Sequence, residues 1–317
     1  MRPGPLGLRP PGATGHRSGV GGLAALLCGE GVLRCRKTIE KEFVVKRFGS
    51  LVAVTSVVAA CVVGLAGVGG ASAAPTLPTL KLALTGKTGI KVSGSEVSGA
   101  VNVTSTFTGK GQGDFGLVRL NPGVTFAQAF HSVQSHHGDI NALTAFGSLV
   151  VDTQAPGTVQ TILTPGNYVA LNVTGNGQPG FEQFKVTQSS SPASLPAAAA
   201  TEASIEFGFK GPQVLHDGSM VRFENDGYLV HMDALIGAPN KAVGQRIIAL
   251  LKAGKDHQAQ KLATGFADLS GPVSPGGMQQ EILNAKPGYY VEACFMDTQD
   301  GREHTQLGME RLIQIRK

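Results

Sequence analysis

The residues best able to do chemistry lie near the C-terminus, where a thiol, an imidazole and a thioether follow one another. Cys294 ends an expected strand, a nine-residue loop leads to His304, and Met309 begins a second expected strand. Cys294 is the only cysteine after an expected export signal, so an intramolecular disulfide is excluded. A lone thiol in an oxidising compartment is a liability. We therefore expect burial or a bound metal to protect Cys294.

The order of these residues resembles the cupredoxins, the blue-copper β-sandwich proteins. A strand precedes Cys294, a loop leads to His304 and Met309, and His231 lies upstream after another strand. Cupredoxins hold copper with two histidines, one cysteine and a weak axial methionine. The resemblance implies His231, Cys294, His304 and Met309 as copper ligands. Plastocyanin-like and azurin-like sites usually have two to four residues between the cysteine and the second histidine, and this longer loop is more similar to uncharacterised secreted bacterial cupredoxin-like proteins.

Each of these residues also has an ordinary structural interpretation. Free cysteines are usually small buried hydrophobic residues, and Cys294 lies on an alternating strand. His231 at a strand start, His304 in a polar loop and Met309 at a strand start have core or solvent roles in most proteins. Zinc accepts the same cysteine and histidine donors as copper. A copper centre, a zinc centre and a metal-free module therefore remain open.

The N-terminal region has the composition of a targeting segment. Residues 1–43 are rich in Gly, Pro and Arg without periodicity, and we interpret them as a non-native or disordered leader. Residues 44–73 have a basic start, an apolar run over 51–68 and a small-residue end at Ala71-Ser72-Ala73, which predicts a cleaved secretion signal. We therefore predict a secreted or extracytoplasmic protein, with the cell envelope as one location.

A second interpretation of the same segment is a lipid anchor. Val58-Ala59-Ala60-Cys61 resembles a bacterial lipobox, which would make Cys61 the lipidated residue. Residues 62–68 stay apolar where a lipoprotein would become polar, so cleavage is the preferred interpretation. A membrane is expected to hold the chain only through an uncleaved signal or a lipid at Cys61.

The charge of the chain is misleading until this segment is removed. The formal net charge is +5, but nine of the 27 basic and three of the 22 acidic residues lie at or before Arg47. Residues 74–317 therefore carry 18 basic and 19 acidic residues. A near-neutral chain without a basic stripe argues against a nucleic-acid partner. A redox protein or an envelope protein is the expected kind of partner.

The remaining chain contains an internal repeat. Pro165-Gly166-Asn167-Tyr168-Val169 matches Pro287-Gly288-Tyr289-Tyr290-Val291, and similar segments precede both at nearly the same spacing. We predict a domain without metal ligands over 78–187, a linker over 188–201 and a domain with the candidate copper site over 202–317. Each is expected to be an all-β, Greek-key cupredoxin-like sandwich with one inserted short helix. The strands are expected at 81–84, 101–107, 117–120, 148–152, 159–163, 168–173, 181–186, 204–209, 220–225, 230–236, 278–283, 289–295 and 309–315.

The first repeat lacks the ligands of the second. On the Pro-Gly-x-Tyr-Val alignment, Asn172 takes the place of Cys294, Phe181 takes that of Met309, and the place of His231 falls near Gly116. The inserted helices are expected to begin after Thr125 and Asn240, both good N-cap residues. We therefore interpret the first repeat as a structural or docking domain.

Sequence motifs also bear on a second metal site and on enzyme activity. His131, His136, His137 and Asp139 form another histidine cluster, but their spacing does not put them on one helical face. The chain has no paired His-x-His motifs, phosphate loop or nucleophile motif. The sequence therefore predicts a copper-binding protein without enzyme activity, and the alternative is a metal-free cell-surface β-sandwich module.

Overall fold

The computed structural model describes residues 76–175 and 178–317. The expected leader, the secretion signal and Cys61 lie outside these residues. Within the described ranges, no helix combines the length and apolarity needed to cross a membrane.

The first half of the described chain is a β-sandwich of two four-stranded layers. One layer has the order β2-β1-β3-β6, and the other has the order β5-β4-β7-β8. Alternating residues Leu80, Leu82 and Leu84 are buried between the layers, which is the pattern of a strand with one solvated face. The elements of this half are β1 (Thr79–Thr85), β2 (Gly89–Gly94), β3 (Gly99–Thr108), β4 (Gly113–Leu120), α2 (Phe126–Ser135), η1 (Ile140–Ala145), β5 (Gly147–Ala155), β6 (Gly157–Leu163), β7 (Gly166–Asn172) and β8 (Gly180–Val186).

The second half has the same strand order. Its layers run β10-β9-β12-β15 and β14-β13-β16-β17, with β11 added beside β17. The chain crosses between the two layers of this half several times, for example from β12 to β13 and from β14 to β15, as in Greek-key sandwiches. The elements of this half are β9 (Ala200–Ile205), β10 (Gly208–Lys210), β11 (Val214–His216), β12 (Met220–Asn225), β13 (His231–Ala238), α3 (Lys241–Lys252), α4 (Asp256–Gln260), β14 (Gly265–Val273), β15 (Met278–Ile282), β16 (Gly288–Ala293), η2 (His304–Leu307) and β17 (Glu310–Arg316).

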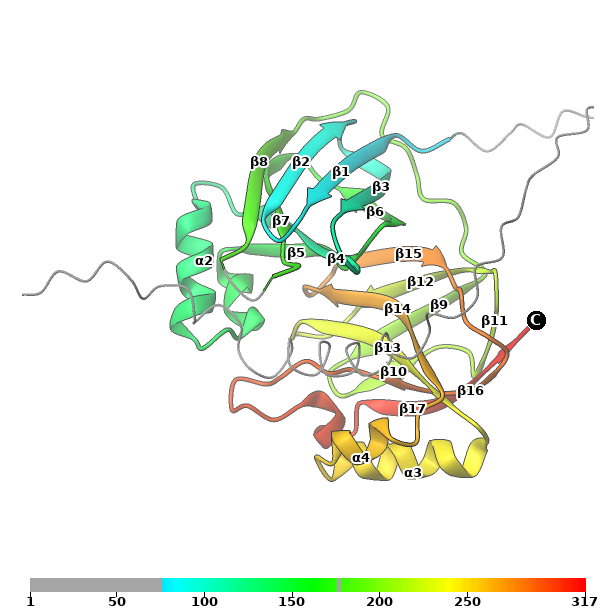
Figure 1. Cartoon of the computed structure of the whole chain (residues 1–317). Coiled ribbons are helices and arrows are strands. Elements are labelled where there is room, and N and C mark those ends of the chain that lie inside the picture. Colours follow the sequence, from blue (N-terminus) through cyan, green and yellow to red (C-terminus); the bar gives the residue numbers. More distant parts are fainter. Residues whose placement is uncertain (1–75, 176–177) are drawn as a thin grey trace, which may run out of the picture.

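The two halves share one continuous sheet. β6 pairs with β15 through Gln160 and Gln280, so eight strands run through both halves (Figure 1). The side chain of Gln280 donates to that of Gln160 at 2.8 Å, which extends the backbone pairing. A Cβ on Gly271 would lie 1.6 Å from the carbonyl oxygen of Asp152, so β14 and β5 approach at a distance that only glycine allows. The all-β fold class is confirmed, whereas the domain bounds 78–187, 188–201 and 202–317 stay a prediction.

Both expected helices are present, and their caps explain where they start. Thr125 and Gln128 form a reciprocal capping box at α2, and the side chain of Asn240 accepts from the N–H of Val243 at α3. Figure 1 shows α3 and α4 on the side of the second half that faces away from the first half. There α3 buries Ile247 and Leu251 on β13, β16 and β17.

Five expectations about the elements are corrected. Residues 204–209 are not one strand, because the chain turns at Glu206-Phe207 between β9 and β10. The strands β2, β11 and β14 were not predicted. β11 has only three residues, and β14 has no alternation, with its last five residues all buried. The second half carries two helices instead of one, since the five-residue α4 is too short for a visible apolar period.

Candidate metal centre

Three of the four predicted ligands lie together. The donor atoms of His231, Cys294 and His304 are all within 4.8 Å of one another, and all three residues are fully buried. They form the one group of three His, Cys, Asp or Glu side chains in the described residues that could hold a metal ion. Sequence separation hides this group, because His231 and Cys294 are 63 positions apart in the chain.

The distances within the group fit a metal ion. The Cys294 sulfur lies 3.3 Å from Nδ1 of His304 and 3.8 Å from Nδ1 of His231. A metal at about 2.0 Å from nitrogen and about 2.3 Å from sulfur, with angles of about 105–120°, separates these atoms by about 3.4–3.7 Å. The observed pair of distances brackets that range. One thiol and two imidazoles are also the donor set of trigonal copper and of tetrahedral zinc sites.

The loop between Cys294 and His304 folds back on itself. Thr298 N–H donates to the carbonyl of Arg302, and Asp297 pairs with Glu303 as an isolated bridge. The N–H of His304 then donates to the carbonyl of Met296 at 2.8 Å. The nine residues thus form a closed hairpin, which returns His304 to the sulfur. The nine-residue loop therefore brings the His304 ring next to the Cys294 sulfur, as a shorter loop would.

The segment before His231 is held by a buried asparagine. The Asn225 amide donates to the carbonyls of Leu229 and Val273, and its oxygen accepts from the N–H of Gly227. Because both ends of the amide are used, the turn over 225–230 is fixed where it enters β13. His231, the first residue of β13, is oriented by that turn.

Gly227 lies directly against the ring of His231. A Cβ built on Gly227 would be 2.7 Å from Nε2 of His231, closer than real Cβ contacts. We expect Gly227→Ala to displace the imidazole and to raise the dissociation constant for Cu(II) about tenfold or more, as changes beside ligands commonly do. Competitive titration with a copper chelator measures this. Gly265→Ala is the control, because its Cβ would meet no atom within 4 Å; equal affinities for both variants would contradict the prediction.

Burial keeps the metal-free site neutral. Desolvation lowers the pKa of His231 to about 3, with a further contribution from His304, and lowers the pKa of His304 to about 4. Burial raises the pKa of the Cys294 thiol to about 12, although backbone N–H groups of Met232 and Met296 point at the sulfur and oppose the shift. The site is therefore a thiol beside two neutral rings, and a cation must displace the thiol proton to bind.

The far nitrogens of both rings are unused. Nε2 of His231 and Nε2 of His304 are buried without a hydrogen-bond partner among the described residues. Phe207 contacts the His304 ring edge-on, with 5.2 Å between ring centroids. Nδ1 of each ring, in contrast, faces the Cys294 sulfur, so Nδ1 is the atom of each imidazole that an ion at this place would meet.

Met309 lies in the same apolar cluster as Cys294. Its side chain is fully buried, and its carbonyl accepts from the N–H of Cys294 at 3.2 Å. Gly308, in the left-handed conformation, ends η2 and places Met309 at the start of β17. Met232 and Met296 are buried in the same cluster. The role of Met309 as the axial ligand stays a proposal.

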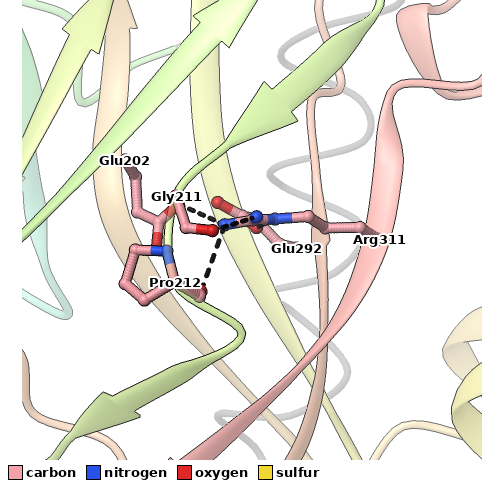
Figure 2. Close-up of polar contacts among 5 residues, drawn as sticks. All are labelled: Glu202, Gly211, Pro212, Glu292 and Arg311. Carbon is pink, nitrogen blue, oxygen red and sulfur yellow. Dashed lines mark hydrogen bonds and ion pairs between the residues drawn. The ribbon is translucent and has the colours of Figure 1, made fainter.

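A buried charged cluster lies between the sheets beside the centre and was not predicted from the sequence. Figure 2 shows Arg311 reaching between Glu202 and Glu292, with which it forms ion pairs, and toward the carbonyls of Gly211 and Pro212. Glu202, Glu292 and Asp233 are fully buried. Burial, with the charge of Glu292 next, raises the pKa of Glu202 to about 9 and that of Asp233 well above its usual range.

The residue of the first half that corresponds to Cys294 has a structural contact. The Asn172 amide donates to the carbonyls of Gly86 and Gly89 and so holds the turn between β1 and β2. The pairing registers also correct two assignments: Leu171 pairs with Gly116 and Phe181, where Ala293 pairs with Ala234 and Glu310. The places of His231 and Met309 therefore fall on Gly113 and Gly180, and neither has a side chain.

The other histidine cluster is not a site of this kind. His131, in the middle of α2, and His136 and His137, just after it, are exposed, and Nδ1 of His136 is 2.8 Å from the carbonyl of Ser132. None of the three belongs to the group of potential metal ligands in the described part of the chain.

Comparisons with known proteins give a likeness in fold. No protein-family model and no curated protein matches the chain. Among solved structures, auracyanin from Roseiflexus castenholzii is 16% identical, covers 38% of this chain and 100% of its own, and has a TM-score of 0.24. A copper-containing nitrite reductase from Thermus scotoductus is 11% identical (75% and 67% covered, TM-score 0.22), and a multi-copper oxidase from Pediococcus acidilactici is 9% identical (76% and 59%, TM-score 0.21). These neighbours are cupredoxins and enzymes with cupredoxin domains. Because these sequence identities and TM-scores are low, the case for a metal centre rests on the residues described above.

One expectation is corrected by these comparisons. The sequence predicted a protein without enzyme activity, but the solved structures that cover about three quarters of the chain are oxidases and nitrite reductases. The lack of His-x-His pairs argued only against one type of copper cluster. It did not exclude catalysis at a single metal centre.

Proposed function

We propose that this chain is a secreted copper-binding protein of the cupredoxin type, built as a tandem repeat whose second half carries the metal. His231, Cys294 and His304 hold the ion in this proposal, and Met309 is its weak axial contact. The observation that carries the proposal is the meeting of one sulfur and two Nδ1 atoms, fully buried, at 3.3 and 3.8 Å. Copper bound there would supply one-electron redox chemistry.

The protein's own residues set the conditions for that chemistry. The fold-back of the loop over 295–303 and the Asn225 turn orient the two rings before any ion arrives, so little rearrangement is required on binding. The buried cluster that contains Met232, Met296 and Phe295 excludes water from the sulfur. A redox protein or an envelope protein is the proposed partner, and electron transfer or copper handling outside the cell membrane is the proposed role.

A Cu(II) titration followed by visible absorption tests the proposal. We expect an intense blue thiolate-to-copper charge-transfer band in the full chain and none in Cys294→Ser, because serine cannot replace the thiolate. Cu(I) and Zn(II) competition then identifies the preferred ion, since zinc uses the same donors without colour.

A colourless protein would favour the metal-free module instead. In the structure the thiol already has His304 as a neighbour, and burial raises its pKa to about 12. Such a thiol is inert and satisfied without a metal. No band, together with no change in thiol reactivity on adding Cu(II) or Zn(II), would contradict the copper proposal.

A further inference from the structure

We propose that Asn141, which belongs to the first half, is a positioning residue of the metal centre in the second half. This inference rests on the proposed function. Under this inference the first half is more than a structural or docking domain, because it supplies a residue that orients the metal centre.

Asn141 is held in one orientation by its own half. It lies in η1 and is 5% exposed. Oδ1 of Asp139 caps this turn and accepts both from the backbone N–H of Asn141, at 2.8 Å, and from its side-chain amide, at 2.9 Å. The backbone bond fixes Oδ1 of Asp139 in place, and the bond from the side-chain amide to that fixed oxygen limits rotation of the Asn141 side chain.

The other hydrogen bonds of the Asn141 side chain are made with residues of the second half. Oδ1 of Asn141 accepts from the N–H of Val230 at 2.8 Å, and Nδ2 donates to the carbonyl of Asp297 at 3.0 Å. Val230 immediately precedes His231. Asp297 is in the loop after Cys294 and is bridged to Glu303, which precedes His304. One side chain thus holds both segments that carry the imidazoles.

Apolar packing supports the same contact. Ile140, next to Asn141, packs against the cluster of the first half that contains Leu143 and also against the cluster that contains Cys294 and Met309. The turn of η1 therefore fits between the two cores. Because the hydrogen bonds and the packing come from adjacent residues, the first half covers and orients the site as a unit.

A copper titration of variants in the full chain tests the assignment. We expect Asn141→Ala to raise the dissociation constant for Cu(II) about 10- to 100-fold, as loss of residues that orient ligands does, and to shift the charge-transfer band. Asn121→Ala is the matched control, because Asn121 donates to the carbonyl of Ala145 in the same turn without reaching the second half. If Asn141→Ala folds poorly, Asn141→Asp replaces it, with the same expected increase because a carboxylate cannot donate to Asp297. All titrations are made well below the melting temperature of each variant.

A metal-free measurement separates this inference from the proposed function. In the absence of metal, we expect iodoacetamide to modify Cys294 at least several-fold faster in Asn141→Ala than in Asn121→Ala, as followed by peptide mass spectrometry. If the wild-type chain binds no copper, the proposed function fails, and the thiol rates alone decide the role of Asn141. Equal rates in the two variants, or equal copper affinity and band position, would overturn the assignment.

Discussion

Replacing Arg311 with methionine is expected to lower the free energy of unfolding by about 3 to 5 kcal/mol. Arg311 forms ion pairs with Glu202 and Glu292, which are both fully buried, and Asp233 is buried beside them. Without the guanidinium, the carboxyl groups keep the cost of burial and lose the charge that offsets it. Urea unfolding at pH 7.5 measures the loss.

The exposed pair between Arg302 and Asp300 provides the control. Both side chains are 56% exposed, so Arg302→Met is expected to cost less than about 1 kcal/mol. A loss below about 1 kcal/mol at pH 7.5 would show that the cluster tolerates its carboxyl groups without the arginine.

The metal-free chain is expected to lose stability as the pH rises from 7 to 9.5. Burial raises the pKa of Glu202 to about 9, and burial together with Asp268 raises the pKa of Glu281 to about 8, from an ordinary value near 4.5. A raised folded-state pKa means that the native state keeps a proton that the unfolded chain has released. The resulting stability is complete below pH 4.5 and is lost as the pH passes through 8 to 9. The lowered pKa values of the two site histidines act only below about 6.5.

Glu281→Gln isolates one of these groups. Glu281→Gln removes this carboxyl group. The slope of the unfolding free energy against pH is expected to become smaller by up to about 1.4 kcal/mol per pH unit between about pH 5 and pH 8. Urea midpoints at several pH values, with a chelator present, measure the slope. Asp226→Asn, which removes an exposed carboxyl, is the comparison variant. A wild-type chain that is equally stable at pH 7 and pH 9.5 would show that these carboxyl groups are solvated.

Local secondary structure was predictable from the sequence wherever it depends on residues that are close together in the chain. Thr125 and Asn240 cap the helices they were expected to cap, because an N-cap bond spans only three residues. Alternating apolar residues, such as Leu82 and Leu84 in the strand expected at 81–84, predicted the strands with one buried face. Strand β14, with its last five residues all buried, has no such pattern and was missed.

The metal centre was predictable as a set of donors in order, and only the tertiary structure decided that they meet. Nothing local to Cys294 shows that nine residues return His304 to within 3.3 Å of the sulfur. The merged sheet, the Arg311 cluster and the reach of Asn141 into the other half were equally hidden, because each depends on residues far apart in the chain. A sequence determines which side chains can bond, whereas packing of the two layers determines which of them are close enough and dry enough to do so.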